Sequence, residues 1–151
     1  MRVFHFASAG FLTFFLSSAN AQAGLGEAAG TVTTDGLYFS ASVVPTAYGT
    51  YTDYVLTLPN GGTVDEYASG GVVFAVSWQT PGRPDLVHLL GSYFTDFQSE
   101  ATPPGRGVRR APPTVDESDL VVVSRGHPGA FSGQAFLRSL VPAGFPLSDL
   151  K

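Results

Sequence analysis

Two pairs of residues in this sequence combine a histidine with a group that could assist acid–base chemistry. The first pair, Ser124 and His127, flanks a glycine-containing turn, and nucleophilic hydrolases pair a serine with a histidine. No G-x-S-x-G motif surrounds the serine, and no third residue is placed by the sequence to orient the imidazole. Turn residues of this kind mostly satisfy the local backbone. The pair is therefore a candidate hydrolase site without its supporting motif.

The second pair, Asp85 and His88, lies three residues apart in a segment with helical periodicity. This spacing lets the two side chains meet, and a carboxylate can orient an imidazole for proton transfer. However, the helical turn puts His88 about 200° from Leu86, which is close to opposite the apolar stripe. The pattern predicts that His88 lies on a solvated helix face.

Other kinds of site have less support. Asp65 and Glu66 are adjacent in a predicted strand and should point to opposite faces, which argues against a paired-carboxylate mechanism. The glycine-rich segment 24–36 has neither the Walker lysine nor the G-x-G-x-x-G context of a phosphate site. The chain contains three histidines and no cysteine. We expect no metal and no cofactor.

Two groups of surface residues are candidates for binding. Tyr48 and Tyr51, with Tyr54 nearby, form an aromatic stretch, and exposed tyrosines suit binding surfaces because they bring large contact area with little loss of entropy. Core packing would explain Tyr54 equally well. Three arginines, at positions 106, 109 and 110, could meet an acidic partner or could simply be solvated.

The elements that must position these residues begin with a meander of strands. Alternating apolar and β-branched residues predict strands at Leu37–Val44, Tyr51–Leu58, Thr63–Tyr67 and Val72–Trp78. Asn60-Gly61 and Gly70-Gly71 are typical of tight turns between them. In the last of these strands, strict alternation puts Phe74 on the face of Val76 and Trp78.

A single long helix is predicted from Pro84 to about Ser99. Its six apolar residues recur at helical spacing and form one stripe that must be buried: Leu86, Leu89, Leu90, Tyr93, Phe94 and Phe97. Residues 101–118 are rich in proline and predict a loop, after which Leu120–Ser124 and Ala130–Leu137 read as strands on either side of a turn at 125–129. One helical turn is expected around Leu147–Leu150.

These elements predict a single α+β domain over residues 37–151. It should contain an antiparallel sheet of about five to six strands packed against one long amphipathic helix. Residues 24–36 are interpreted as a flexible leader in which an edge strand begins at Thr31–Thr34.

The amino-terminal residues predict export. Arg2 precedes an apolar run from Phe6 to Leu16, and the small residues Ala19, Ala21 and Ala23 offer two overlapping A-x-A cleavage sites, after Ala21 or after Ala23. An uncleaved membrane anchor is the alternative, although polar residues interrupt the run and a spanning helix needs about 20 apolar residues. We expect a signal peptide at residues 1–23, a periplasmic or extracellular product and no membrane insertion after cleavage.

Composition narrows the class of partner. The chain of 151 residues has 8 Lys and Arg against 12 Asp and Glu, and loss of Arg2 with the leader leaves a net charge of about −5. Nucleic-acid binding normally requires clustered basic residues, so this class is excluded. Without cysteine, no disulfide can stabilise the fold, which must depend on an apolar core.

Several motifs together resemble a family of exported bacterial proteins known as domain of unknown function family 2844. The residues that carry the resemblance are Gly62-Thr63-Val64, Glu66-Tyr67, 73–78, Pro84-Asp85-Leu86, Leu89-Leu90-Gly91, Tyr93-Phe94, Leu120-Val121-Val122, Gly126-His127, Ala130-Phe131 and 141–144. Asp65 departs from the pattern, in which a basic residue precedes Glu66. The resemblance implies export and a shared fold, and it carries over no catalytic residue.

The absence of a visible nucleophile, base and orienter favours a non-catalytic exported protein that binds a partner or assists assembly in the envelope. An envelope protein or a glycan is the expected partner, and a sheet edge is one way to hold it. The alternative is an envelope hydrolase that uses His127 with Ser124 or with an acidic residue.

Overall fold

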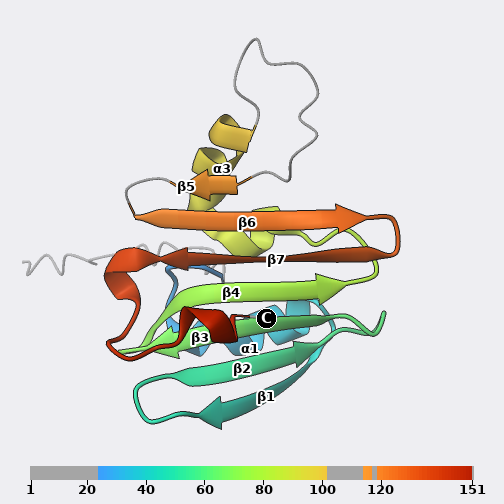
Figure 1. Cartoon of the computed structure of the whole chain (residues 1–151). Coiled ribbons are helices and arrows are strands. Elements are labelled where there is room, and N and C mark those ends of the chain that lie inside the picture. Colours follow the sequence, from blue (N-terminus) through green and yellow to red (C-terminus); the bar gives the residue numbers. More distant parts are fainter. Residues whose placement is uncertain (1–23, 102–113, 117–118, 151) are drawn as a thin grey trace, which may run out of the picture.

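A computed structural model describes residues 24–101, 114–116 and 119–150, and it contains one antiparallel sheet of seven strands in the order β1-β2-β3-β4-β7-β6-β5 (Figure 1). The α+β class and the antiparallel sheet are confirmed, whereas the predicted count of five to six strands is too low. The strands are β1 Ser42–Ala47, β2 Thr52–Thr57, β3 Thr63–Ser69, β4 Val72–Thr80, β5 Thr114–Asp116, β6 Leu120–His127 and β7 Ala130–Leu137.

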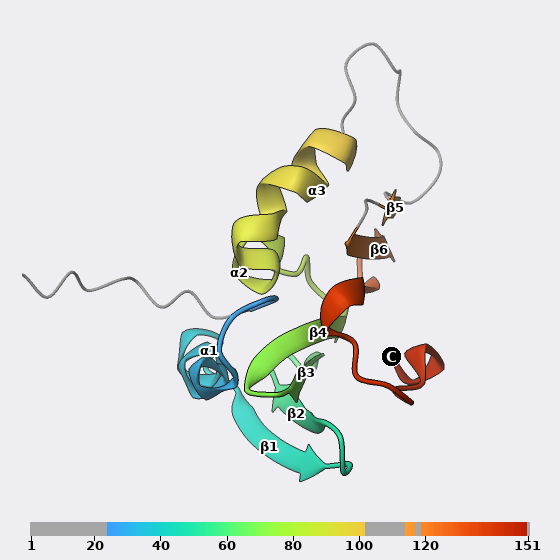
Figure 2. The same ribbon diagram turned by 90° about the vertical axis from the view of Figure 1, so that its left-hand side faces the viewer.

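The two faces of the sheet are covered by different segments. Helices α1 (Val32–Tyr38), α2 (Leu86–Leu90) and α3 (Phe94–Ala101) lie on one side, and the carboxyl-terminal segment lies on the other (Figure 2). The helical side holds the main core, in which Trp78, Leu56 and Leu90 are fully buried. Within the described residues, no helix is long and apolar enough to span a membrane.

The meander of β1 to β4 follows the predicted turns. In the β2–β3 turn, the side-chain oxygen of Asn60 accepts a hydrogen bond from the amide of Gly62 at 2.9 Å, and Gly61 has a φ of +83°. Glycine adopts such a positive φ without steric cost, so the Asn-Gly pair fixes this turn and the register of the two strands it joins.

The predicted long helix is interrupted, so the expectation of one continuous helix is wrong. Helix α2 ends at Leu90, a 3-10 turn covers Gly91–Tyr93, and α3 begins at Phe94. Gly91 has a φ of +52° and a ψ of −127°, a conformation that a helix cannot continue through and that glycine tolerates best. The stripe still faces the sheet, because Leu90 and Phe97 are buried on either side of the break.

Residues 24–36 pack into the domain. The edge strand expected at 31–34 is wrong, because a 3-10 helix at Ala29–Thr31 leads into α1. Leu25 and Val32 are fully buried in the core, and the amide of Leu25 donates to the carbonyl of Leu89 at 3.0 Å. Because α1 runs to Tyr38, the first strand begins five residues later than predicted and includes Pro45.

A bulge corrects the predicted faces of β4. Tyr67 pairs with Ala75 and Ala68 pairs with Val73, which leaves Phe74 as the extra residue. Phe74 therefore joins Ala75 against the carboxyl-terminal segment, while Val73 and Val76 face the helices. Simple alternation would have put Phe74 beside Val76.

The remaining strands extend the predicted ones. Strand β7 has the predicted bounds, whereas β6 runs to His127, so the turn is shorter than the predicted 125–129. Strand β5 lies inside the predicted loop 101–118, whose residues 102–113 and 117–118, including the three arginines, are outside the described residues. A 3-10 helix at Leu147–Asp149 confirms the predicted final turn.

Candidate functional site

Three titratable side chains meet beneath the helices on the core side of the sheet. Asp35 comes from α1, Glu66 from β3 and His88 from α2, and we call them the acid cluster. Both carboxyl groups are completely buried, and the His88 side chain is only 13% exposed. Acidic residues are almost never fully buried without partners, so this cluster requires a physical explanation.

The contacts within the cluster account for the buried charge. The Nε2–H group of His88 donates a hydrogen bond to Oδ1 of Asp35. The other Asp35 oxygen and both Glu66 oxygens meet no N–H or hydroxyl donor among the described residues. The buried carboxyl groups of Asp35 and Glu66 interact with each other, and because two buried like charges repel, the pair is favoured when one of them keeps its proton.

Glu66 is the residue that keeps this proton. Burial raises its pKa to about 9, and repulsion from the Asp35 charge acts in the same direction. Burial also raises the pKa of Asp35, but the hydrogen bond from His88 opposes the shift. At neutral pH, Glu66 therefore keeps its proton, and His88 pairs with Asp35 from the other side.

Aromatic rings hold the imidazole in place. The ring of Tyr38 stacks on His88, with centroids 3.8 Å apart and planes 3° apart. Phe39 meets the imidazole edge to face at 5.0 Å. The acid cluster and these two rings together lock α1 against α2.

Asp85 has a different role from the one that its spacing suggests. Its Oδ1 accepts a hydrogen bond from the His88 amide at 3.1 Å, which makes it the N-cap of α2. Its Oδ2 accepts from the Tyr38 hydroxyl at 2.8 Å, and this bond raises the pKa of Tyr38. The prediction that His88 lies on a solvated face is wrong, since Asp35 rather than Asp85 holds the imidazole.

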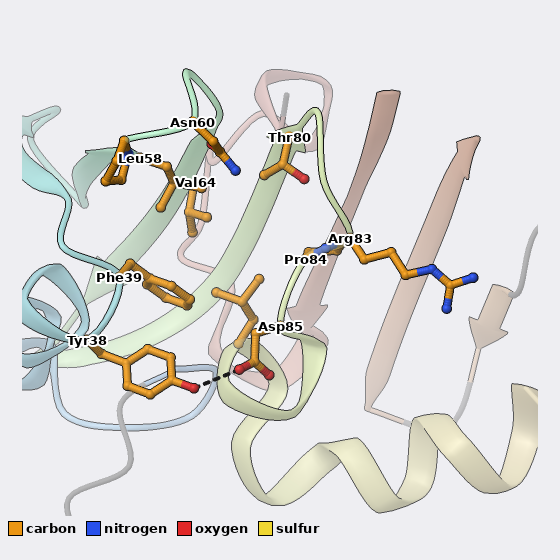
Figure 3. A pocket seen from close by; sticks show the side chains of 11 residues that line it. Tyr38, Phe39, Leu58, Asn60, Val64, Thr80, Arg83, Pro84 and Asp85 are labelled. Atoms are coloured by element: carbon orange, nitrogen blue, oxygen red, sulfur yellow. Dashed lines mark hydrogen bonds between the residues drawn. The ribbon is translucent and has the colours of Figure 1, made fainter. Parts of the chain in front are cut away.

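A cavity of about 390 Å³ opens beside the Tyr38–Asp85 pair (Figure 3). Apolar side chains from the sheet and α2 form its floor, and polar groups lie around its rim. The Arg83 side chain points away from the cavity in Figure 3. The lining residues are Tyr38, Phe39, Leu58, Pro59, Asn60, Val64, Thr80, Arg83, Pro84, Asp85 and Leu89.

The predicted hydrolase pair is not brought together. Ser124 and His127 lie on β6 in continuous register with β7, so residues three apart point to opposite faces of the sheet. His127 is exposed at the hairpin end, where its Nδ1 lies 3.1 Å from the carbonyl oxygen of Pro128. The two residues therefore cannot form a serine–histidine hydrogen bond in this arrangement.

The predicted binding tyrosines lie together at the turn between β1 and β2. Tyr48 is 53% exposed and stacks on Tyr51, with centroids 5.1 Å apart. Tyr51 in turn meets Phe74 and Phe145 edge to face, so it belongs to the packing on the carboxyl-terminal side. Of the two, only Tyr48 presents a largely open ring.

Sequence reasoning missed the acid cluster, although one signal pointed toward it. Asp65 and Glu66 do point to opposite faces, as predicted, and Asp65 lies next to Ser77 on the other side of the sheet. A carboxylate expected on the covered face of a central strand needs a partner, and Glu66 finds it in Asp35. Among the described residues, no group of three or more potential ligands could hold a metal ion.

The cavity lining combines apolar side chains with a few polar groups. Its two hydroxyl groups are already engaged, because Tyr38 donates to Asp85 and Thr80 donates to the carbonyl of Gly82. Among the described residues of the lining, none pairs a free nucleophile with a base. An apolar floor with a few polar groups at the rim is the usual form of a small-molecule site.

Comparison with known proteins places the chain in a family. A search of curated proteins and a search of solved structures gave no match. The sequence model of one family, described as protein of unknown function (DUF2844), matches residues 21–150, which is most of the chain. The chain therefore belongs to the DUF2844 family.

Proposed function

We propose that this protein is an exported, non-catalytic binding protein of the cell envelope, which holds a small ligand in the cavity beside Tyr38 and Asp85. The observation that carries the proposal is the construction of the cavity. Val64 and Leu89 on its floor are buried core residues, only 2% and 1% exposed, so the site is preformed. A preformed site avoids the entropy cost of ordering on binding.

The acid cluster supports this role because it fixes the two helices that flank the cavity. It ties α1 to α2 through the hydrogen bond between His88 and Asp35, and these two helices carry Tyr38 and Asp85 into the cavity wall. Burying charged groups costs free energy that an apolar core would not cost. In return, directional bonds between such groups fix the helices of a binding site more specifically than apolar contacts do.

The sheet edge is a less suitable place for a partner. The amide of Tyr48 donates to the carbonyl of Tyr51, so the even-numbered amides of β1 face β2 and the odd-numbered ones face outward. Pro45 therefore removes a donor from the outer edge of the sheet, which is how natural edge strands avoid pairing with other chains. This favours the cavity over β-strand addition as the binding mode.

The alternative is an envelope hydrolase that uses His127 with Ser124 or with an acidic residue; the pairing with Ser124 is the less favoured form, because Ser124 and His127 point to opposite faces of β6. An envelope protein or a glycan remains a proposed partner, for which the exposed ring of Tyr48 is the best-placed contact.

A titration followed by NMR tests the binding role. The probe is 3,3-dimethyl-1-butanol, a neutral molecule with a compact apolar end and one hydroxyl. We expect saturable shifts of the methyl signals of Leu58, Val64 and Leu89. Leu58→Trp should abolish the shifts by filling the cavity, whereas Val44→Trp, which adds the same ring at an exposed position on β1, should leave them unchanged. Shifts that do not saturate, or that Leu58→Trp leaves intact, would contradict the proposal.

Export is tested separately by mass spectrometry of the native product. We expect a chain that begins at Gln22 or Gly24, recovered from outside the cytoplasm. An intact chain that begins at Met1 and remains in the cytosol would refute export and leave the cavity proposal standing.

A further inference from the structure

We infer that the cavity recognises a ligand with a methylated ammonium head group and a short apolar tail. The inference rests on the proposed binding function and adds the chemical class of the ligand. It is carried by three cavity-lining residues, Tyr38, Phe39 and Asp85, which bring two aromatic rings and one carboxylate to the same end of the site.

The two rings form a corner. Their centroids are 5.0 Å apart and their planes meet at 83°, and Phe39 is equally distant, at 5.0 Å, from His88, so Phe39 lies beside the Tyr38–His88 stack. His88 covers one face of Tyr38, yet 57% of Tyr38 is exposed, which leaves its other side open. The open face of Tyr38, with Phe39 at its edge, can therefore receive a methylated ammonium group through a cation–π interaction.

The charge at this corner is negative. The Asp85 carboxylate lies within hydrogen-bonding distance of the Tyr38 hydroxyl, and its two present bonds leave further lone pairs free. Among the described residues that line the cavity, Arg83 is the only cationic one, and its guanidinium group points away from the cavity. A cation in the corner would therefore meet an uncompensated carboxylate.

The apolar side chains and Asn60, which line the other end of the cavity, suit the tail of the ligand. Leu58, Val64 and Leu89 give an apolar floor that suits a hydrocarbon tail, while Asn60 at the far rim can hydrogen-bond a polar tail end. Methyl groups on the nitrogen match this environment better than a bare ammonium, since a bare ammonium must give up strongly bound water to enter it.

A matched pair of probes tests the head group. Choline and 3,3-dimethyl-1-butanol have nearly the same shape and differ in the charge at the quaternary centre. Titration of the protein with each, followed by NMR of the aromatic and methyl signals of the cavity, should give a choline dissociation constant about threefold to tenfold lower. The preference should shrink as salt is added, because Asp85 is exposed.

Two variants and one control show which residues produce the preference for choline. Asp85→Asn keeps a side chain that caps α2 but removes the charge, so most of the preference for choline should be lost and only the part supplied by the rings should remain. Asp96→Asn makes the same change at an exposed position on α3 outside the cavity lining and should leave the preference intact. Phe39→Leu should reduce the preference by removing one ring.

The outcomes separate this inference from the proposed function. Equal binding of the two probes to the unmodified protein would overturn the head-group inference and leave the cavity as a binding site. Absence of binding by both probes would overturn both. A preference for choline that Asp96→Asn lowers as much as Asp85→Asn does would show general attraction to an acidic protein, and would also overturn the inference.

Discussion

The two faces of the sheet are stabilised by different physics. On the helical face, the acid cluster of Asp35, Glu66 and His88 is held by directional hydrogen bonds and one retained proton. On the opposite face, an aromatic cluster of Tyr51, Tyr67, Phe74 and Phe145 is held by edge-to-face and tilted ring contacts at centroid distances of 4.8 to 6.4 Å. The stability of the acid cluster therefore depends on specific hydrogen-bond partners, whereas the stability of the aromatic cluster depends on buried apolar area.

The difference also bears on function. The aromatic cluster fastens the carboxyl-terminal segment to the sheet, since Phe145 and Leu150 pack there and Tyr67 donates to the carbonyl of Asp149 at 3.3 Å. Apolar packing is sufficient for that task. The acid cluster instead sets the positions of two helices at a cavity, where direction matters more than area.

Removing the imidazole from the acid cluster should produce the largest effect. His88→Ala leaves the Asp35 charge buried without its partner, and we expect the free energy of unfolding to fall by about 3 to 5 kcal/mol. Urea denaturation at pH 7 measures this. The same substitution at exposed His127 should cost less than about 0.5 kcal/mol.

A second variant distinguishes the charge from simple packing. In His88→Ala with Asp35→Asn, the remaining side chain is neutral, so part of the lost stability should return. If the double variant were as unstable as the sum of the two single variants, the cluster would be behaving as independent packing residues, and our interpretation of it would be wrong.

Truncation in the aromatic cluster should cost slightly less and should not depend on pH. Phe145→Ala removes a ring that contacts Tyr51, Tyr67 and Phe74, and we expect a loss of about 3 kcal/mol. Burial raises the pKa of both Tyr51 and Tyr67, so neither ring ionises between pH 5 and pH 8. Urea midpoints that shift with pH across this range, relative to the unmodified protein, would contradict the contrast between the two faces.

The aromatic face was the more predictable of the two from sequence. Alternation along each strand assigns faces locally: applied to residues 130–137, it puts Phe136 on the face opposite Phe131 and Leu137, and the structure has the same arrangement. It failed at Phe74, because a bulge adds one residue to β4 and no local pattern announces it. The antiparallel meander was predictable because its turns carry their own sequence signals.

The acid cluster could not be predicted because its partners are far apart in the chain. Asp35 and His88 are separated by 53 residues, and Asp35 lies in a segment of small and polar residues that has no apolar periodicity. The helical wheel misplaced His88 because α1, which covers that side of α2, was not foreseen. Tertiary contacts, rather than local sequence preference, determine where the side chains of Asp35 and His88 lie.

The retained proton gives the acid cluster a dependence on pH that the aromatic cluster lacks. In the unfolded chain Glu66 ionises at its ordinary pKa of 4.5, whereas in the folded protein its pKa is about 9. Between these values the folded state binds the proton and the unfolded state does not. The contribution of Glu66 to stability is therefore fully present below pH 4.5 and is lost as the pH rises toward 9, at up to about 1.4 kcal/mol per pH unit.

Glu66→Gln should remove this dependence. The amide can donate to Asp35 as the protonated acid does, but it cannot ionise. We expect the difference in unfolding free energy between the variant and the unmodified protein to move in favour of the variant as the pH increases from 5 to 8. Glu100→Gln, an exposed change on α3, is the control. Parallel pH profiles for Glu66→Gln and the unmodified protein would show that Glu66 is ionised when buried.

The smallest effect concerns the link between the acid cluster and the cavity. Asp85 both caps α2 through the His88 amide and accepts the Tyr38 hydroxyl at the cavity wall. Asp85→Ala removes both bonds and should lower the free energy of unfolding by about 1 kcal/mol, the usual cost of losing an N-cap. Asp85→Asn keeps one oxygen acceptor, which preserves the cap on the His88 amide but gives up the bond from Tyr38, so its cost should be a few tenths of a kcal/mol. Both variants remove the charge, but only Asp85→Ala removes the cap. A binding defect common to both variants therefore reports on the cavity, whereas a stability defect confined to Asp85→Ala reports on the helix. Equal loss of stability in both would mean that the charge of Asp85, rather than its hydrogen bonds, holds α2 in place, and the cavity wall would then depend on the same electrostatics as the buried cluster behind it.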